Sequence, residues 1–338
     1  MQIYSGFFEL ARKGVIKLKV TPIKSTSESI PITNVRINKK YTAVYDALDG
    51  LTWIYGDEAA NLEHFGKTYN VDFYFKRSFA NVLPGYAHEK CRVFPLGLNY
   101  NVQPEKDIFS LVPSAAEKIK YILKRYRLFR GFSDARFFYA KDFEHYPLPG
   151  NKSRVLFITR LWDPAEAKSE RSEHFRACIN NARVASIEAC KKKYGALFTG
   201  GLEKNNFSVT TFPSLVLPEE LTRKEQYLQA IKNHTICIAT TGLHHSIGWK
   251  FAEYVAASRA IVTEPLQFEL PGNFGEAVNY LSFKGTENLI EQIDFLLTNR
   301  SFTRQMMQNN FQYYNNYVNP ERLVLNTLLK IADETLRS

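Results

Sequence analysis

The sequence predicts an α/β protein with two domains, each built on a doubly wound parallel sheet. A chain of 338 residues is too long for one ordinary hydrophobic core, so two domains are the default. Through the second half of the chain, short apolar runs alternate with stretches of helical spacing, which is the pattern of a parallel sheet with crossover helices. Pro147, Pro149 and Gly150 mark a boundary loop. We therefore expect domains at 1–150 and 151–318, followed by a helical segment at 319–338 that can pack back on the first domain.

The composition indicates a basic, well-packed protein. The formal charge is +10 and the isoelectric point is near 9.2, so the surface attracts anions such as nucleotides, anionic lipids, acidic glycans or nucleic acid. Hydrophobic residues make up 45% of the chain, which is enough for two cores. No apolar run reaches the ~18–20 residues that span a bilayer. Charged residues also interrupt any signal sequence at the N-terminus. We expect a cytoplasmic protein that can touch the inner face of a membrane peripherally.

Four widely separated cysteines lie in or beside apolar runs. They show no CxxC or Cys/His spacing, so packed, reduced thiols are favoured over disulfides or metal ligands. They are Cys91, Cys178, Cys190 and Cys237.

The first domain begins with helical spacing over 1–14, followed by alternation typical of a strand at 15–20. A parallel α/β domain normally opens with a strand, so its first strand is absent or supplied differently. The segment 21–34 is predicted as a loop or a poorly formed strand. Further strands are predicted at 41–45, 71–75 and 91–99, with a helical stretch up to residue 67 between the first two.

Charged residues follow two of these strands. Asp46 and Asp49 come after the strand at 41–45, and Lys76 and Arg77 come after the strand at 71–75. Ligands of open parallel sheets lie outside the carboxyl ends of strands, so the two carboxylates are candidate catalytic groups and the two cations candidate cleft residues. The alternative for Asp49, followed by Gly50, is an ordinary turn.

A basic amphipathic helix is predicted over 117–130. A solvated charged face is one explanation and contact with a membrane surface is the other.

The second domain is predicted as strands at 154–159, 196–199, 236–240 and 260–263, with helices at 176–190, 221–232 and 247–257 between them. A last helix is expected at 321–335. Arg160 directly follows the first of these strands, at a position where ligands bind in such sheets.

Residues 240–263 combine a strand end, a Gly-containing turn and a helix start. On a helix of 3.6 residues per turn, Lys250 shares a face with Glu253 or Tyr254. A helix start after a strand binds anions because its N–H groups and the macrodipole favour negative charge. The layout suits a nucleoside diphosphate; the alternative is a surface ion pair worth ~0.2–0.5 kcal/mol. The candidate donor-binding residues are Arg160, Thr241, Gly242, His244, His245, Ser246, Lys250, Glu253 and Tyr254.

These residues resemble the donor-binding motif of GT-B glycosyltransferases, which reads Lys, two residues, Glu-Tyr, one residue, Ala, before a buried strand. Here the motif is Lys250-Phe-Ala-Glu253-Tyr254-Val-Ala256. Phe157-Ile-Thr-Arg160 resembles the family's strand with a basic residue for the diphosphate, and Phe94-Pro-Leu-Gly97 resembles an element of its first domain. The resemblance implies two Rossmann-like domains facing a cleft, and a metal-independent site for a nucleotide-diphosphate sugar with no further cofactor.

The chain departs from that family pattern at two positions. His245 stands where retaining members carry the first Glu of a Glu-seven residues-Glu motif, and Ser258 stands where many relatives have Gly. The first departure leaves the donor and the stereochemistry open, because a His can donate to a phosphate or a sugar hydroxyl. His245 as a turn residue without a ligand is the alternative.

We therefore expect a glycosyltransferase that moves a sugar to a hydroxyl acceptor, by analogy a glycan or glycolipid of the cell envelope. One alternative is an enzyme that rearranges the nucleotide sugar, such as a 2-epimerase. The other is a basic nucleic-acid-binding protein. That class usually interleaves Lys and Arg with exposed aromatic residues, a pattern that is weak here.

Overall fold

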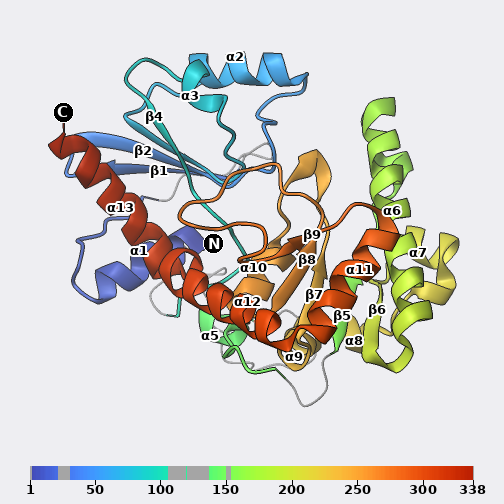
Figure 1. Cartoon of the computed structure of the whole chain (residues 1–338). Coiled ribbons are helices and arrows are strands. Elements are labelled where there is room, and N and C mark those ends of the chain that lie inside the picture. Colours follow the sequence, from blue (N-terminus) through green and yellow to red (C-terminus); the bar gives the residue numbers. More distant parts are fainter. Residues whose placement is uncertain (1, 22–30, 106–118, 120–136, 150–153, 338) are drawn as a thin grey trace. The chain divides into compact units, whose positions relative to one another are not determined.

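The computed structural model describes residues 2–21, 31–105, 119, 137–149 and 154–337 (Figure 1). The chain forms two compact units. One contains Met1–Phe143 with Asn315–Ser338, and the other contains Glu144–Tyr314. The division falls upstream of the expected boundary at 150/151, and the closing helical segment belongs to the first unit.

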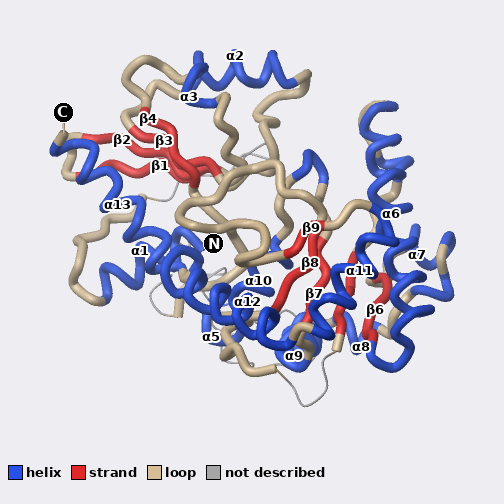
Figure 2. The backbone as a smooth tube through the Cα atoms, in the orientation of Figure 1, coloured by secondary structure: helices blue, strands red, loops and turns tan. Residues whose placement is uncertain are grey.

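The described residues of the first unit contain a four-stranded sheet in the order β1-β2-β3-β4 (Figure 2). Its strands are β1 (Ile32–Ile37), β2 (Tyr41–Asp46), β3 (Phe73–Lys76) and β4 (Arg92–Pro95). β2, β3 and β4 run parallel, whereas β1 pairs antiparallel with β2. Residues 38–40 join β1 to β2, and Asn38 and Lys39 have positive φ angles of 50° and 58°, as a tight hairpin turn requires.

The two faces of this sheet pack against different helices. Ala43, Tyr45, Phe73 and Phe75 form a core with α1 (Gln2–Arg12) and α13 (Pro320–Leu336). The alternate residues Val44, Tyr74 and Val93 pack with Trp53 and with Leu62 and Phe65 of α2 (Glu58–Thr68). The period of two along each strand produces this division. The described part of the unit also contains the short helices α3 (Leu83–Tyr86) and α5 (Ala140–Phe143).

Close packing of α1 on α13 brings residues from opposite ends of the sequence together (Figure 1). A Cβ added to Gly6 would lie 2.1 Å from the carbonyl oxygen of Pro320, so only glycine fits this approach. The Gln2 amide donates to the carbonyl oxygen of Val318 at 2.6 Å, and Lys13 pairs with Glu321 at 2.5 Å. The last helix therefore completes the core of the first unit.

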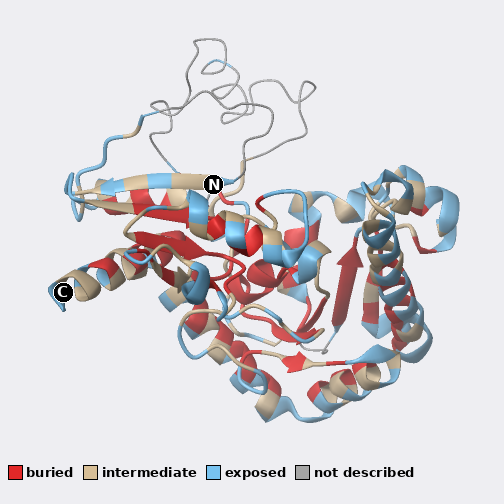
Figure 3. Ribbon diagram, turned by 90° about the horizontal axis from the view of Figure 1, so that it is seen from above, coloured by how far each residue is buried: buried red, intermediate tan, exposed pale blue. Residues whose placement is uncertain are grey.

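The second unit contains a five-stranded parallel sheet in the order β6-β5-β7-β8-β9. The strands are β5 (Val155–Thr159), β6 (Phe198–Leu202), β7 (Ile236–Ala239), β8 (Ala260–Thr263) and β9 (Leu281–Ser282). Every residue of β5, β7 and β8 is buried (Figure 3). Continuous apolar runs of this kind are typical of a parallel sheet covered on both faces.

Helices cover both faces of this sheet. The chain moves from β5 to β6 in one direction and from β7 to β8 in the other, so right-handed crossovers place α6 (Glu170–Tyr194) and α10 (Trp249–Ala256) on opposite faces. α11 (Gly285–Thr298) joins α6 on its face. The others are α7 (Asn206–Thr211), α8 (Glu219–Thr222), α9 (Lys224–Asn233) and α12 (Arg300–Tyr313).

The α/β class is confirmed, as are the predicted strands of both sheets and the opening and closing helices. The strand predicted at 15–20 is wrong: those residues are unpaired and mostly exposed, because alternation makes a strand only where a neighbour offers an edge. β1 lies partly inside the segment 21–34, which was predicted as a loop or a poorly formed strand, and extends beyond it. The two-residue β9 was not predicted. The basic helix predicted over 117–130 lies outside the described residues except for residue 119. No helix in the described part is long and apolar enough to cross a membrane.

Candidate functional site

The topological switch of the second unit lies between β5 and β7. These neighbouring strands lead to helices on opposite faces, and ligands of open parallel sheets bind outside the carboxyl ends of strands at such a point. Their pairing covers only Val155 with Ile236 and Leu156 with Cys237. Beyond that point the strand ends are held by side chains instead of a backbone ladder.

Arg183 of α6 provides this support. It is 7% exposed and donates to the carbonyl oxygens of Arg160 at 2.6 Å and Thr241 at 3.2 Å, and to the hydroxyl of Thr240 at 3.0 Å. Burial lowers the pKa of its guanidinium to about 10, although Glu264 partly opposes the shift. One buried cation thus joins the segments that follow β5 and β7.

The turn between β7 and α10 is compact. The Gly242 N–H donates to the carbonyl oxygen of Ser246 at 2.9 Å, and Ser246 is buried. The N–H and hydroxyl of Thr241 both donate to Glu264, which follows β8, at 2.7 Å.

His244 and His245 are exposed and have φ angles of 57° and 55°. Non-glycine residues in this region are uncommon and occur often at functional sites. The His245 ring meets the Phe175 ring edge-on at 4.9 Å.

Lys250 lies in the first turn of α10 and bonds to β5 and to the residue that follows β6. Its Nζ donates to Glu203, which directly follows β6, at 2.5 Å and to the carbonyl oxygen of Ile158 at 2.7 Å. Burial lowers the pKa of Lys250, while Glu203 opposes that change. Burial would raise the pKa of Glu203, but Lys250 outweighs it and the pKa lies below its ordinary value. An ammonium group has three N–H donors, so these two bonds leave one for another acceptor.

Glu253 and Tyr254 follow on the same helix and have different surroundings. Glu253 is 2% exposed and its Oε1 accepts from Lys224 at 2.5 Å, whereas its buried Oε2 has no hydrogen-bond partner among the described residues. Tyr254 is fully buried in the core and its hydroxyl accepts from that of Tyr227 at 3.2 Å. Of these two positions, only Glu253 presents an unused polar atom.

Arg160 is exposed directly after β5, and its guanidinium lies 4.2 Å from the centre of the Trp162 ring. Stacking on an aromatic face restricts the side chain while leaving its N–H groups available in the plane. Arg160 also acts on the Lys250 pair, since its charge helps to lower the pKa of Glu203.

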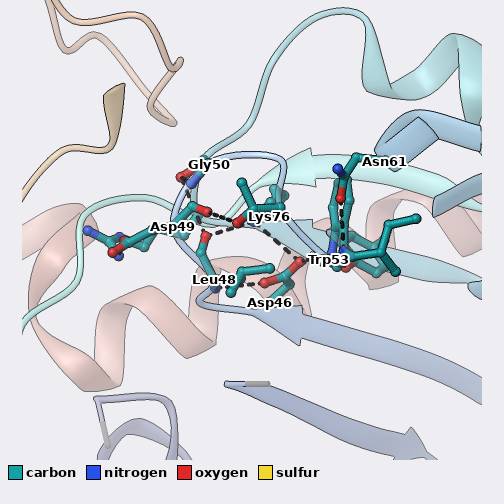
Figure 4. A network of polar contacts seen from close by, with 12 residues as sticks. Asp46, Leu48, Asp49, Gly50, Trp53, Asn61 and Lys76 are labelled. Atoms are coloured by element: carbon teal, nitrogen blue, oxygen red, sulfur yellow. Dashed lines mark hydrogen bonds and ion pairs between the residues drawn. The ribbon is translucent and has the colours of Figure 1, made fainter. Parts of the chain in front are cut away.

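In the first unit, Asp46 is the centre of a buried polar network (Figure 4). It is fully buried and accepts hydrogen bonds from Tyr74 at 2.6 Å, from the Trp53 indole at 2.7 Å and from the Leu48 N–H at 2.7 Å. Lys76 lies 3.3 Å away. The carboxylate is saturated and closed to a substrate hydroxyl in this structure.

Lys76 and Arg77 are also buried. Lys76 is fully buried, donates to the carbonyl oxygen of Leu48 at 2.7 Å, and has its pKa lowered to about 8 by burial. Arg77, 6% exposed, pairs with Asp49, whose side chain is 51% exposed. Asp49 is therefore the predicted catalytic carboxylate that solvent can reach.

The structure brings Arg160, Thr241, Gly242, Ser246, Lys250 and Glu253 to the carboxyl edge of the second sheet. It also adds four residues that the sequence analysis did not identify: Arg183, Glu203, Lys224 and Glu264. Glu203 and Glu264 follow strands directly, the signal that identified Arg160. Arg183 and Lys224 carry no such signal, because neither is the single cation of its helix.

Other features of the described residues lie outside this group. A surface hollow of about 420 Å³ beyond β6 is lined by Lys204, Asn205, Asn206, Val209, Thr210 and Glu219. The described residues contain no group of three or more His, Cys, Asp or Glu side chains placed to hold a metal ion.

Comparison with known proteins gives no matching family model and no matching curated protein. Among solved structures, similarity is found to glycosyltransferases. The C-terminal domain of a glycosyl transferase group 1 family protein (LpcC) from Francisella tularensis is 14% identical, with 52% of this chain and 95% of that chain covered and a TM-score of 0.35. HepE from Anabaena in complex with UDP is 10% identical, with 86% and 72% covered and a TM-score of 0.44. WaaG, a glycosyltransferase involved in lipopolysaccharide biosynthesis, is 11% identical, with 79% and 65% covered and a TM-score of 0.41. Likeness at these values assigns this chain neither a family nor an activity.

Proposed function

We propose that this protein is a glycosyltransferase that moves a sugar from a nucleotide-diphosphate sugar to a hydroxyl acceptor. The observation that carries the proposal is Glu253, a buried carboxylate with one oxygen unpartnered among the described residues, three residues after Lys250 on α10. Arg160 follows β5 directly, at the carboxyl edge of the same sheet. A buried carboxylate oxygen needs a donor, and the hydroxyls of a ribose supply one. The flanking cations suit the diphosphate.

Each group has a distinct role. Glu253 accepts from the ribose, while Arg160 and the third N–H of Lys250 hold the diphosphate together with the start of α10. His245 can donate to a phosphate or to a sugar hydroxyl. These groups stabilise the negative charge that develops on the leaving diphosphate, which is the contribution a metal ion makes in other transferases. The proposed reaction is metal-independent and uses no cofactor beyond the donor.

For the acceptor side we propose Asp49 as the base or as a contact to the attacking hydroxyl, because it is the exposed member of the pair Asp46 and Asp49. The acceptor we propose is a glycan or lipid-linked glycan of the cell envelope, reached by a cytoplasmic protein that can contact an anionic membrane peripherally. The net charge of +10 favours such an anionic surface.

Titration calorimetry with nucleoside diphosphates tests the donor site. Glu253→Gln should weaken binding by about 10- to 100-fold, the range expected for losing a hydrogen bond to a charged group. Lys250→Met should weaken diphosphates more than the corresponding nucleosides. Glu188→Gln, an exposed change on α6, is the matched control and should bind normally. Unchanged affinity in Glu253→Gln would remove Glu253 from the site.

The products distinguish the alternatives. A transferase accumulates a glycosylated acceptor, whereas a 2-epimerase forms an isomeric sugar with no acceptor present. A nucleic-acid-binding protein would instead show steeply salt-dependent affinity for RNA or DNA and none for nucleoside diphosphates.

A further inference from the structure

The two carboxylate oxygens of Glu253 have different surroundings, and the difference involves Lys224. Oε1 accepts from Lys224 Nζ at 2.5 Å, while Oε2 is buried without a hydrogen-bond partner among the described residues. Leaving such an acceptor unsatisfied costs about 1–3 kcal/mol, and more for a charged group. Oε1 is therefore occupied from within the protein, and Oε2 is the buried oxygen left without a donor among the described residues.

Lys224 reaches Glu253 from the first turn of α9. Its side chain is 34% exposed, so the ammonium group extends from the surface to a carboxylate that is 2% exposed. Nζ also lies 5.2 Å from the centre of the Tyr227 ring, one turn further along the helix. Because Tyr227 is buried and its hydroxyl donates to Tyr254, the ring on which Lys224 rests is itself fixed.

Lys250 does not take the place of Lys224. Its ammonium group lies on the same Tyr227 ring, 5.0 Å from the centre, but it bonds to Glu203 and to the carbonyl oxygen of Ile158. Glu203 is thus paired with Lys250, and Glu253 with Lys224. Removing Lys224 would leave Glu253 as a buried charge with no bonded cation, an arrangement that costs far more than losing a surface pair.

We propose that Lys224 is a positioning residue for ribose recognition. It holds Oε1 of Glu253 and thereby directs Oε2 toward the vicinal hydroxyls of the ribose. This inference rests on the proposed function, in which Glu253 accepts from the ribose of the donor. Lys224 acts through Glu253, so its effect is confined to ligands that carry those hydroxyls. A site built to hydrogen-bond a hydroxyl discriminates strongly against an analogue that lacks it.

The test compares a ribonucleoside diphosphate with its 2′,3′-dideoxy counterpart by calorimetry on the full chain. The ribonucleotide is the strongest binder among UDP, GDP, ADP and CDP in a thermal-shift screen. The wild type should prefer the ribonucleotide by at least about 100-fold. In Lys224→Met the preference should fall below about tenfold, mainly through weaker ribonucleotide binding, and Lys224→Arg should restore it because a cation again holds Oε1.

Arg223→Met provides a matched control. It removes the neighbouring cation, which lies 4.0 Å from the exposed Glu219, and should keep the wild-type preference. If Lys224→Met does not fold, Lys224→Gln replaces it, since its amide can still donate to Oε1 without a charge, and an intermediate preference is expected. Equal weakening of both ligands, or a wild-type preference in the Met or Gln variant, overturns the role of Lys224 while the proposed function stands. A wild type that binds none of the four nucleoside diphosphates overturns both.

Discussion

The buried guanidinium of Arg183 donates to the carbonyl oxygen of Arg160 at 2.6 Å. It thereby fixes the backbone of Arg160, whose own side chain is exposed. The other two bonds of Arg183 reach Thr240 and Thr241 after β7. The pairing of β5 with β7 ends before this point, and Arg183 therefore takes over the role of the backbone ladder at the switch of the sheet.

Replacing Arg183 with Met should destabilise the second unit. The change removes three hydrogen bonds and leaves buried acceptors unsatisfied, so we expect a loss of about 2–4 kcal/mol in the free energy of unfolding. Chemical denaturation measures it. Lys192→Met, an exposed change on the same helix, should have little effect. Equal stability of the two variants would show that Arg183 does not support the strand ends.

The Glu203–Lys250 pair should make stability depend on acid pH. The pKa of Glu203 in the folded protein is below its ordinary value of 4.5, because Lys250 outweighs the effect of burial. The pair therefore stabilises the fold above pH 4.5, and that contribution is lost as pH falls through the lowered pKa. Melting curves should show a steeper loss of stability on acidification in the wild type than in Glu203→Gln. Parallel pH profiles would contradict this coupling.

The four cysteines should differ in reactivity. Cys178 is exposed, whereas burial raises the pKa of Cys91 to about 11 and of Cys190 to about 12, and also raises that of Cys237. The thiolate is the reactive form. A thiol reagent at neutral pH should therefore modify one group in the folded protein and four after denaturation. Cys178→Ser should abolish the fast reaction; a remaining fast phase would mean that another thiol is accessible.

Substitution of Asp46 should mainly reduce the free energy of unfolding, whereas substitution of Asp49 should mainly reduce turnover. Asp46→Ala leaves Lys76 buried without its carboxylate and should cost about 3–5 kcal/mol. Asp49→Asn should cost less, because water screens a half-exposed carboxylate, but should reduce turnover about 10²–10⁴-fold if Asp49 is the base. Denaturation and product formation are measured on both variants. A near-normal rate for Asp49→Asn would exclude it as the base.

The sequence by itself determined the α/β class and the strands of both sheets other than β1 and β9, because continuous apolar runs such as 155–159 and 260–263 are stable only where both faces are covered. It also placed Arg160 at a strand end, and Lys250 and Glu253 near a helix start, because local sequence determines where strands end and helices begin. The strand prediction for the alternating segment 15–20 was wrong because strand formation also requires a partner strand, which a distant part of the sequence must supply.

Only the tertiary structure decided which of these groups are available. Lys250 is paired with Glu203, Glu253 is held by Lys224, and Asp46 is enclosed by Tyr74 and Trp53, with partners between 7 and 47 residues away in the sequence. Burial and ion pairing depend on which side chains the fold brings into contact, and a local sequence pattern does not predict those contacts. The same holds for α13, whose packing on α1 at Gly6 places Leu323, Val324 and Ile331 in the core of the first unit.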